Sequence, residues 1–534
     1  MDIIHKLAKI ESEYAWEIFY QCVHPDEMVR EAGRKLELEI NTKKRNILSK
    51  LEPIDNLDNK EHIKNLNNEI LLNKPELLEI NEEIDILSQE FNKNIVESNP
   101  IMRLNEDDYM SFDKYGHEFT LTNDKYTYIL KYCNDPTIRK NAYIIYNNIA
   151  ENNTSILNDI RAKRNIIANI LGYDAYSSLM LSFNYIKTSD KLNKFLKDFY
   201  NYVLPINIKQ IKKLEEYFNT NVNSITDITY YTTKYLDENY IDSDSLRDYF
   251  ELNHVFQEMI SIYEELFNCN IQYKDAELYH NDVRMIEVST EKSIGHIILD
   301  LKQRENKFSH PSNFPIIRRH VYPDYIQNPV TALLTSFDND HITHDNVITL
   351  FHEFGHSMHE VLNLSDYVNS GGTFCTKDLV EIPSMVLENL AWDRDILKRI
   401  SKHKDTSIPL SDEQIDNLIS SRYSCKANYY LIQIAYSLFD INFYDNKIQL
   451  EDFSKYICEI THLDECKTNR QNRFIHLVGY ATRYYTYLYN IVYADKIYNK
   501  IKSPEYMNFI KYSTDENFSA LGEYDIKLFV KKID

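Results

Sequence analysis

Hydrophobic residues recur every three or four positions between residues 347 and 361. The recurring positions are Val347, Phe351, Phe354, Met358 and Val361. This spacing puts all of them on one face of an amphipathic helix, with polar side chains on the other face. Asp345 and Asn346 are residue types that cap a helix N-terminus, and Asn363 is a type that ends a helix. The pattern therefore predicts a half-buried helix between these residues.

Most of the remaining chain has the same helical pattern. Residues 1 to about 110 carry leucine and isoleucine at helical spacing among many charges, which predicts helical hairpins. Helices are expected to continue through residues 111–290, including Arg161–Met180, and to return after the predicted helix up to the C-terminus. Only 9 glycines and 13 prolines occur in 534 residues, and this scarcity of helix breakers supports a mainly α fold.

One segment has the pattern of a strand instead. Residues 295–301 read Gly-His-Ile-Ile-Leu-Asp-Leu, a β-branched and apolar run between polar residues. Prolines then come in quick succession, at Pro311, Pro315, Pro323 and Pro329. We therefore expect a strand and then a loop-rich stretch immediately before the predicted helix.

The composition narrows the class of protein. A formal net charge of −22 argues against nucleic-acid binding, which needs a basic surface. An acidic surface attracts cationic substrates in some proteins, but more often it only keeps the protein in solution. No apolar run reaches the length of a membrane span, so we expect none. The seven cysteines are scattered without a Cys-x-x-Cys pair, which indicates a reducing compartment and no structural disulfides.

The predicted helix carries the sequence His352-Glu353-Phe-Gly-His356. Two histidines four residues apart lie on one helical face, about one turn from each other, so both imidazoles can bind one zinc ion. The glutamate between them can then act as general base on a water molecule that the metal activates. The alternative is a surface helix that contains these letters by chance.

A zinc hydrolase needs a third protein ligand, because three residues and one water complete the metal site. The candidates are Glu360, Glu381 and Glu388. Glu360 lies on the predicted helix itself, too far along it to share the metal. Glu381 follows the pair Gly371-Gly372, which can reverse the chain, and Pro383 puts it in a first helical turn or at a kink. We therefore assign Glu381 to zinc.

Other residues near the ligands are assigned to supporting roles. Glu388 lies seven residues after Glu381, on the same face of a continuous helix, where a carboxylate can orient a histidine ligand. The alternative for Glu388 is a solvated helix charge. Asp378 is assigned to the same supporting layer. His359 shares a helix face with His352 but lies seven residues away, so we expect packing or support and no metal bond.

Near the C-terminus, a histidine is followed by tyrosines at helical spacing. The positions are His476, Tyr480, Tyr484 and Tyr487. They can share one helical face, although Gly479 can divide the segment into a loop and a helix. The chain contains 42 tyrosines, so packing in the core is the ordinary interpretation, and catalysis is the alternative.

These motifs together resemble the family of zinc oligopeptidases that includes thimet oligopeptidase and neurolysin. The matching segments are residues 352–359, residues 372–384 with Leu387-Glu-Asn389, the strand 295–301 with Arg304, Lys307 and His310, and residues 160–173. The resemblance covers roughly residues 110–500. Within the family the branch of mitochondrial intermediate peptidase is most similar, on Gly372-Thr-Phe-Cys375 and on the spacing of His476 and Tyr484.

The resemblance implies a helical zincin-like peptidase with a small β-sheet near the active site, a deep substrate channel and one zinc ion on its floor. It implies zinc ligands His352, His356 and Glu381, with Glu353 as the general base. It also implies that His476, Tyr484 and Tyr487 contact the transition state, with Tyr480 nearby and Gly355 close to the site. Residues 1–110 are expected to form an N-terminal helical region and residues 111–534 the catalytic region, with its core at 290–490.

The expected activity is zinc-dependent endopeptidase action on short or unfolded peptides, by a monomer. One form removes N-terminal octapeptides from precursor proteins imported into the mitochondrial matrix or a mitochondrion-derived organelle. The other form clears free peptides in the cytoplasm, which the acidic N-terminal residues without a presequence pattern favour. A third interpretation is an inactive relative that only binds peptides.

Overall fold

The computed structural model describes residues 2–54, 60–240, 244–292, 294–305, 307–308 and 310–533. Most of them are helical, and a five-stranded sheet is the main β element, as the sequence predicts. Contacts divide the chain into two compact units. The first comprises Met1–Pro75, Asp242–Ile419 and Asn490–Asp525, and the second comprises Glu76–Ile241, Ser420–Tyr489 and Ile526–Asp534. The predicted division into an N-terminal region (1–110) and a catalytic region (111–534) stays a prediction.

The sheet of the first unit has the strand order β3-β4-β5-β9-β6. Its strands are β3 (Asn270–Lys274), β4 (Arg284–Ser289), β5 (Ile294–Lys302), β6 (Ser312–Ile317) and β9 (Val330–Phe337). β5 and β9 are parallel and the other pairs are antiparallel. A separate hairpin pairs β7 (His320–Val321) with β8 (Ile326–Gln327). The strand predicted at 295–301 is therefore confirmed, at the position of β5.

Two expectations about this region are wrong. The stretch 111–290 is not helical to its end, because β3 and β4 fall within it. The stretch rich in proline is not mainly loop, because it contains β6 and the start of β9. Pro315 is tolerated in β6 because β6 is the edge strand and its pairing with β9 shifts between Pro315 and Ile317.

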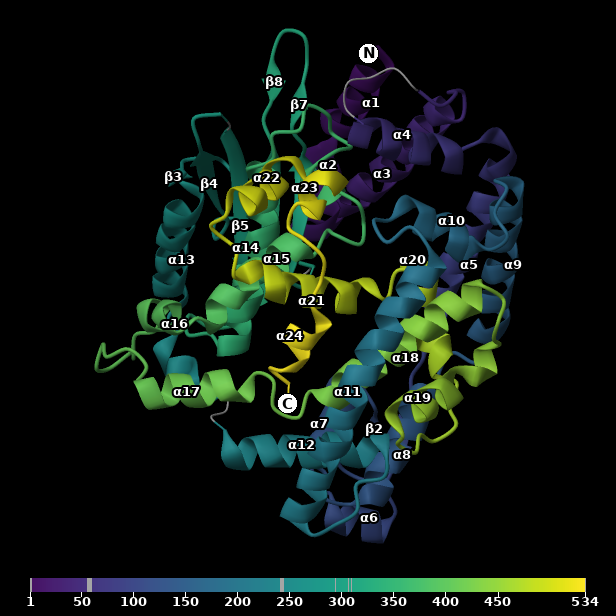
Figure 1. Cartoon of the computed structure of the whole chain (residues 1–534), viewed down its shortest axis with the longest axis vertical. Helices are drawn as coiled ribbons and strands as arrows, with labels where there is room; N and C mark the ends of the chain where they lie inside the picture. Colours follow the sequence, from purple (N-terminus) through teal and green to yellow (C-terminus); the bar gives the residue numbers. More distant parts are fainter. Residues whose placement is uncertain are drawn as a thin grey trace. The chain divides into compact units, whose positions relative to one another are not determined.

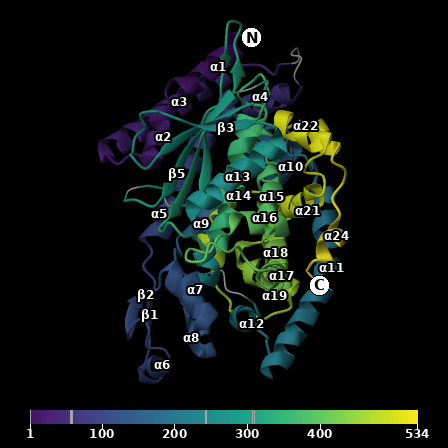
Figure 2. The same cartoon turned by 90° about the vertical axis from the view of Figure 1, so that its left-hand side faces the viewer.

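Helices cover this sheet in the first unit (Figures 1 and 2). α14 (His344–Val361) packs on β5, β6 and β9, and α2 (Ala15–Val23) packs against β6. The predicted apolar stripe of α14 explains its place, since all five of its residues are buried. The other helices of this unit are α1 (Asp2–Glu13), α3 (Glu27–Leu48), α4 (Lys60–Leu72), α13 (Leu252–Phe267), α15 (Ile382–Glu388), α16 (Arg394–Ile400), α22 (Pro504–Tyr512) and α23 (Asp515–Ser519). α17 (Asp412–Ser421) begins in this unit.

The second unit is built almost wholly from helices. They are α5 (Leu78–Glu97), α6 (Glu106–Ser111), α7 (Asn123–Tyr132), α8 (Pro136–Asn147), α9 (Asn153–Ile170), α10 (Tyr176–Phe183), α11 (Ser189–Phe218), α12 (Ile225–Asn239), α18 (Ala427–Tyr444), α19 (Phe453–Thr461), α20 (His476–Gly479) and α24 (Ile526–Val530). α21 (Thr486–Tyr498) begins in this unit, and β1 (Ile101–Arg103) pairs with β2 (Glu118–Thr120). The helix expected over Arg161–Met180 is two helices, because Gly172 adopts a φ of +80° after α9.

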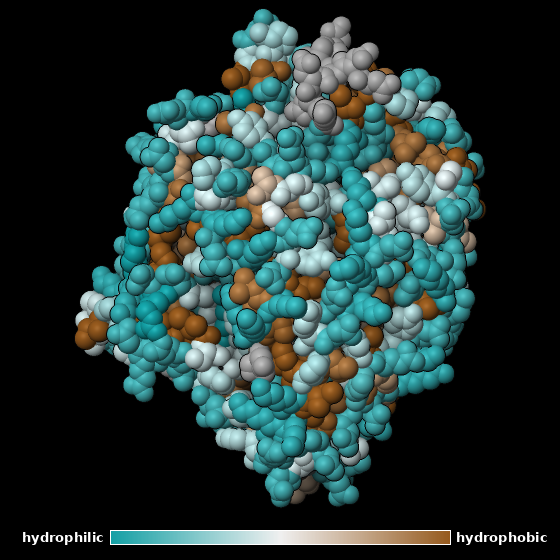
Figure 3. Space-filling model, viewed as in Figure 1, coloured by the Kyte–Doolittle hydropathy of each residue, from teal (hydrophilic) through white to brown (hydrophobic). Residues whose placement is uncertain are grey.

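The surface agrees with the composition. Hydrophilic residues cover most of the face shown in Figure 3, and the apolar residues on it are scattered among them. All seven cysteines are free thiols, as expected. Within the described ranges, every helix is too short or too polar to cross a lipid bilayer.

Candidate functional site

α14 begins earlier than the sequence suggests. The N-cap is Thr343, whose hydroxyl accepts the backbone N–H of Asn346 at 3.1 Å, while the Asn346 side chain accepts the Thr343 N–H at 3.3 Å. This reciprocal capping box makes Asn346 the third residue of the helix and Asp345 a first-turn residue, so neither of them is the cap. His352, Glu353 and His356 consequently lie in the middle of a rigid helix.

A tight turn brings the chain back to this helix. Gly371 and Gly372 have φ values of +84° and +55°, a region that glycine adopts without strain. The Glu360 carboxylate at the end of α14 accepts the backbone N–H of Thr373 at 2.8 Å and also the Thr373 hydroxyl. A Cβ on Gly372 would lie 2.5 Å from Glu360 Oε2. Glu360 therefore ties this turn to α14, and that contact is its role in the structure.

α15 then packs directly on α14 (Figure 1). Gly355 permits the close approach, because a Cβ at that position would meet the backbone Cα of Ser384 at 2.9 Å. Glu381 is the N-cap residue of α15, and Pro383 lies in its first turn, where a missing N–H costs nothing. Glu381 and Glu388 thus mark the two ends of one short helix that faces the histidines.

The structure brings His352, His356 and Glu381 together. Their ligand atoms all lie within 4.8 Å of one another. Glu381 Oε2 is 3.0 Å from His356 Nε2 and 3.3 Å from His352 Nε2. Two imidazole nitrogens and one carboxylate oxygen converging on one point are a donor set typical of a catalytic zinc site. The three residues therefore fit a zinc ion.

Glu388 contacts His352 at the ring nitrogen that is not directed at Glu381. Its Oε2 lies 3.0 Å from His352 Nδ1, which leaves Nε2 of that ring directed at Glu381. A carboxylate on the far nitrogen of a ligating histidine fixes the orientation of its ring. Asp378, assigned to the same layer from the sequence, is fully buried three residues before Glu381.

Charges within the cluster are strongly coupled. Burial lowers the pKa of His352, but the carboxylates of Glu381 and Glu388 outweigh it, so that pKa lies well above the usual range. Burial raises the pKa of Glu381, but His356 and His352 outweigh it, so that pKa lies well below the usual range. Glu381 is accordingly held as a carboxylate, the form that binds a metal.

Glu353 lies beside this cluster in a different electrostatic setting. Burial raises the pKa of its carboxyl group, against the opposing effect of the two neighbouring histidines. The backbone of Asn313 in β6 also lowers this pKa. Asn313 is itself held by the hydroxyls of Ser357, at 2.8 Å, and Thr331, at 2.7 Å. The sheet edge therefore contacts the candidate general base, which the sequence did not indicate.

His359 faces away from the cluster. Its Nε2 lies 2.7 Å from the hydroxyl of Ser513, just after α22, and its side chain is fully buried. Burial lowers the pKa of His359 to about 3, so it is neutral at ordinary pH. This geometry suits a packing role.

In the second unit, the predicted histidine and tyrosines cluster in space. His476 Nε2 lies 3.3 Å from Tyr487 Oη, and the ring centroids of His476 and Tyr484 are 5.0 Å apart. Tyr480 is at the margin, with its hydroxyl 3.1 Å from Thr486 Oγ1. The segment is not one helix, because α20 ends at Gly479 and α21 starts at Thr486. Burial lowers the pKa of His476 and raises that of Tyr484, so both are neutral near pH 7.

Two buried charges that the sequence analysis did not single out hold this segment. Arg164 in α9 donates to the carbonyl oxygens of Leu477, at 2.9 Å, and Val478, at 2.5 Å. Asp440 in α18 accepts backbone N–H groups from Thr482, at 2.8 Å, and Tyr484, at 3.1 Å. A signal for Asp440 was present, since it is the one charged residue in the 18-residue helix α18.

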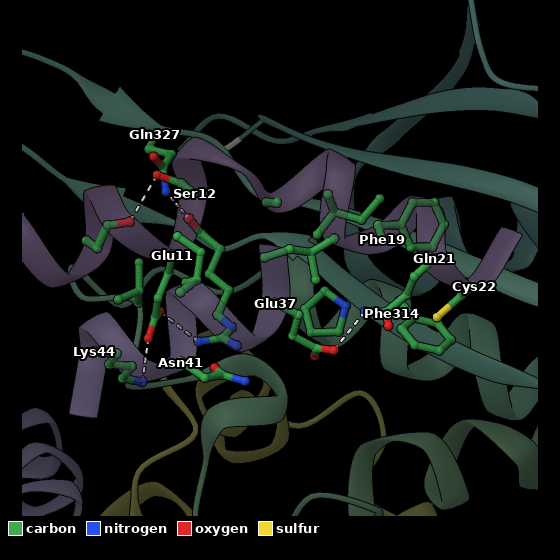
Figure 4. A pocket seen from close by; sticks show the side chains of 18 residues that line it. Glu11, Ser12, Phe19, Gln21, Cys22, Glu37, Asn41, Lys44, Phe314 and Gln327 are labelled. Carbon is green, nitrogen blue, oxygen red and sulfur yellow. Dashed lines mark hydrogen bonds and ion pairs between the residues drawn. The ribbon is translucent and has the colours of Figure 1, made fainter. Parts of the chain in front are cut away.

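A separate pocket of about 320 Å³ lies in the first unit between the N-terminal helices and the edge strand β6. Figure 4 shows Glu11 linked to Lys44, at 2.5 Å, with Phe19 beside Phe314. Its described lining contains neither the histidines of the cluster nor Glu381.

Comparison with known proteins finds similar peptidases. The chain is 27% identical to saccharolysin of Saccharomyces cerevisiae over 495 residues, covering 80% of this chain and 68% of that protein. It is 26% identical to the mitochondrial intermediate peptidase of Candida glabrata, covering 80% of this chain and 65% of that protein. The chain thus spans about two thirds of the length of these relatives.

Solved structures share the fold. The solved structure of PZ peptidase A with an inhibitor superposes with a TM-score of 0.57 at 14% identity, covering 99% of this chain and 98% of that chain. The family model described as peptidase family M3 matches residues 129–518, which include α14, α15 and the tyrosine cluster. This chain belongs to peptidase family M3.

Proposed function

We propose that this protein is a zinc-dependent metalloendopeptidase that hydrolyses short or unfolded peptides. The convergence of His352, His356 and Glu381, with their ligand atoms within 4.8 Å of one another, carries this proposal. These three residues would hold one zinc ion per chain. When bound, zinc polarises the scissile carbonyl group and lowers the pKa of water.

Glu353 would move the protons of the reaction. Its carboxylate takes a proton from the attacking water and later gives it to the nitrogen of the departing amine. A pKa raised by burial suits this task, because a group that both takes and gives a proton works best near the operating pH. The backbone of Asn313 acts in the opposite direction to burial, since it favours the carboxylate form of Glu353.

His476, Tyr484 and Tyr487 would stabilise the transition state. A neutral histidine and tyrosine hydroxyl groups can donate hydrogen bonds to the oxygen that gains negative charge during attack. Their mutual contacts support one shared role, since His476 Nε2 lies 3.3 Å from Tyr487 Oη and the rings of Tyr484 and Tyr487 are 5.3 Å apart. Glu388 would orient His352, and the buried Asp378 would support the ligands.

The proposal also concerns which peptides the protein cleaves. Removal of N-terminal octapeptides from precursor proteins, in a mitochondrion or an organelle derived from one, is favoured by the likeness to mitochondrial intermediate peptidase over 501 residues. Clearance of free oligopeptides in the cytoplasm is the second candidate, and the likeness to saccharolysin over 495 residues supports it.

Two substrates and one variant test the proposal. The purified chain is incubated with a precursor protein whose basic presequence has been trimmed, and separately with free peptides of eight to ten residues. Glu353→Gln should keep zinc and lose nearly all turnover of either substrate. Cleavage of the precursor alone supports processing, and cleavage of the free peptides alone supports clearance. A wild-type chain that binds zinc and cleaves neither is an inactive peptide-binding relative.

A further inference from the structure

The loop between α20 and α21 is held in a strained shape. Thr482 adopts a φ of +64°, the left-handed region that β-branched residues avoid. Such a conformation persists only where the surroundings compensate for it, and it concentrates at functional sites. Thr482 is also fully buried, and its hydroxyl donates to the carbonyl of Ala481 at 2.6 Å. The strain therefore lies two residues before Tyr484, at the point where the chain turns into α21.

Asp440 supplies the compensation. Its Oδ1 accepts the Thr482 N–H at 2.8 Å and its Oδ2 accepts the Tyr484 N–H at 3.1 Å, so one carboxylate spans the strained residue. Charge-assisted hydrogen bonds of this kind are about twice as strong as those between neutral groups. The Asp440 side chain is fully buried. Its described hydrogen bonds go to this loop, and none reaches another side chain.

An ionised carboxylate at the buried position of Asp440 lowers the stability of the folded state. Burial raises the pKa of Asp440 to about 7, against the opposing effect of hydrogen bonds from Thr482 and Tyr484 and of the Arg164 charge. The ionised group thus lowers the stability of the folded state at neutral pH relative to a neutral group of the same size. Asp440 lowers the stability of the fold and orders one loop. This combination is expected of a residue that is retained for function.

The loop that Asp440 orders carries the ring that we place in the oxyanion site. Tyr484 packs edge-on against His476, with centroids 5.0 Å apart, and against Tyr487, at 5.3 Å. Its side chain is only 7% exposed, so a shift of its backbone moves the ring within a closed cluster. A catalytic donor misplaced by about 1 Å can lose a hundredfold in rate.

We propose that Asp440 is a positioning residue for catalysis: by holding the Thr482 and Tyr484 amides it sets the Tyr484 hydroxyl for transition-state contact. This inference rests on the proposed function, because it needs Tyr484 to act in the reaction. The same contact makes the loop responsive to pH. The groups that face Asp440 are the Arg164 guanidinium from α9, the Tyr444 hydroxyl from α18 and the amides of residues 482–484.

The direction of the pH response follows from the raised pKa of Asp440. Above pH 7 the carboxylate is ionised and accepts both amides strongly. Below pH 7 it takes up a proton, its acceptor strength falls and the loop loosens. The kcat of the wild type should therefore rise as the pH increases through about 7. The kcat of Asp440→Asn should rise less over the same pH range, because asparagine does not ionise.

A double-mutant cycle tests the proposal. The variants are Asp440→Asn, Tyr484→Phe, their combination, and Ser437→Ala as a matched control. Ser437 is a fully buried polar residue on the same helix whose hydroxyl donates within α18, to Gln433 at 2.7 Å. The readouts are kcat and KM on one peptide between pH 5.5 and 8.5, the zinc content and the thermal midpoint.

We expect Tyr484→Phe to lower kcat about a hundredfold and Asp440→Asn about tenfold, with KM and zinc content near wild type. The double variant should be no slower than Tyr484→Phe, because Asp440 acts through that hydroxyl. Asp440→Asn should keep its thermal midpoint at pH 8 within about 3 °C of wild type, since it also loses a buried charge. Ser437→Ala should keep the wild-type kcat.

Four results would overturn the proposal. Multiplicative losses in the double variant mean that Asp440 acts by another route. A kcat loss that only follows a fall in thermal midpoint means that Asp440 is structural. Wild-type turnover in Asp440→Asn, with Tyr484→Phe impaired, refutes this inference and leaves the proposed function standing. Wild-type turnover in Tyr484→Phe removes that tyrosine from the proposed mechanism, and the inference with it.

Discussion

Gly355→Ala tests whether close packing of two helices sets the metal site. The glycine lies on α14 between His352 and His356, and it faces α15. An alanine Cβ would stand 2.9 Å from the Cα of Ser384 and 3.4 Å from Leu387 Cβ. The first contact is with backbone, so it cannot be relieved by rotating a side chain.

The size of the effect of Gly355→Ala follows from the 2.9 Å between the added Cβ and the Cα of Ser384. Ordinary van der Waals contact begins near 3.4 Å, so α15 must move away from α14 by about 0.5 Å. Overpacking of this kind costs about 1–3 kcal/mol of stability. Because Glu381 and Glu388 stand at the ends of α15, the same shift moves a ligand and its supporting carboxylate away from the histidines. We expect zinc affinity to fall about tenfold to a hundredfold, as when a supporting contact of a ligand is lost.

The assay is competition for zinc against a coloured chelator, together with thermal unfolding in the presence of EDTA. Gly479→Ala is the matched control, because a Cβ there meets nothing within 4 Å and its backbone has no positive φ. It should bind zinc like the wild type. If Gly355→Ala binds zinc with wild-type affinity and unfolds at the wild-type temperature, helix contact does not set the geometry of the site.

Two further predictions concern residues that hold the site in place. Glu388→Gln should weaken zinc binding about tenfold to a hundredfold in the same competition assay. The reason is that a neutral amide orients His352 less strongly than the carboxylate that lies 3.0 Å from its Nδ1. An unchanged zinc affinity would mean that Glu388 is only a surface charge. Arg164→Lys should lower both the thermal midpoint and kcat, about tenfold for kcat, because an ammonium group cannot reproduce the forked bonds to the carbonyls of Leu477 and Val478. Arg161→Lys, on the same helix but bonded at the surface to Ile448 and Gln449, is its control and should leave kcat unchanged.

The metal helix could be predicted because its signal is local. Five apolar residues at helical spacing define the buried face of α14, and the two histidines follow at a spacing that any helix converts into proximity. The start of α14 differs from the prediction, because Asp345 and Thr343 are both good caps and only the hydrogen bonds distinguish them. Sequence signals of this kind leave boundaries uncertain by a few residues.

What could not be predicted depends on contacts distant in sequence. β6 carries Pro315, a residue that argues against a strand unless the strand is known to lie at an edge. The bond from the Ser357 hydroxyl to the Asn313 side chain arises only when β6 and α14 pack together. Asp440 and Arg164 act on a segment that is close to them only in space, so neither spacing nor periodicity indicates their role.

Metal analysis of two histidine variants tests the central claim most directly. Zinc per chain is measured in the wild type, in His356→Gln, which loses a proposed ligand, and in His359→Gln, which changes a buried histidine on the same helix that faces Ser513. We predict about one zinc per chain in the wild type and in His359→Gln, and little zinc in His356→Gln. Zinc retained in full by His356→Gln, or absent from the wild type at neutral pH, would contradict the metal site on which the proposed function depends.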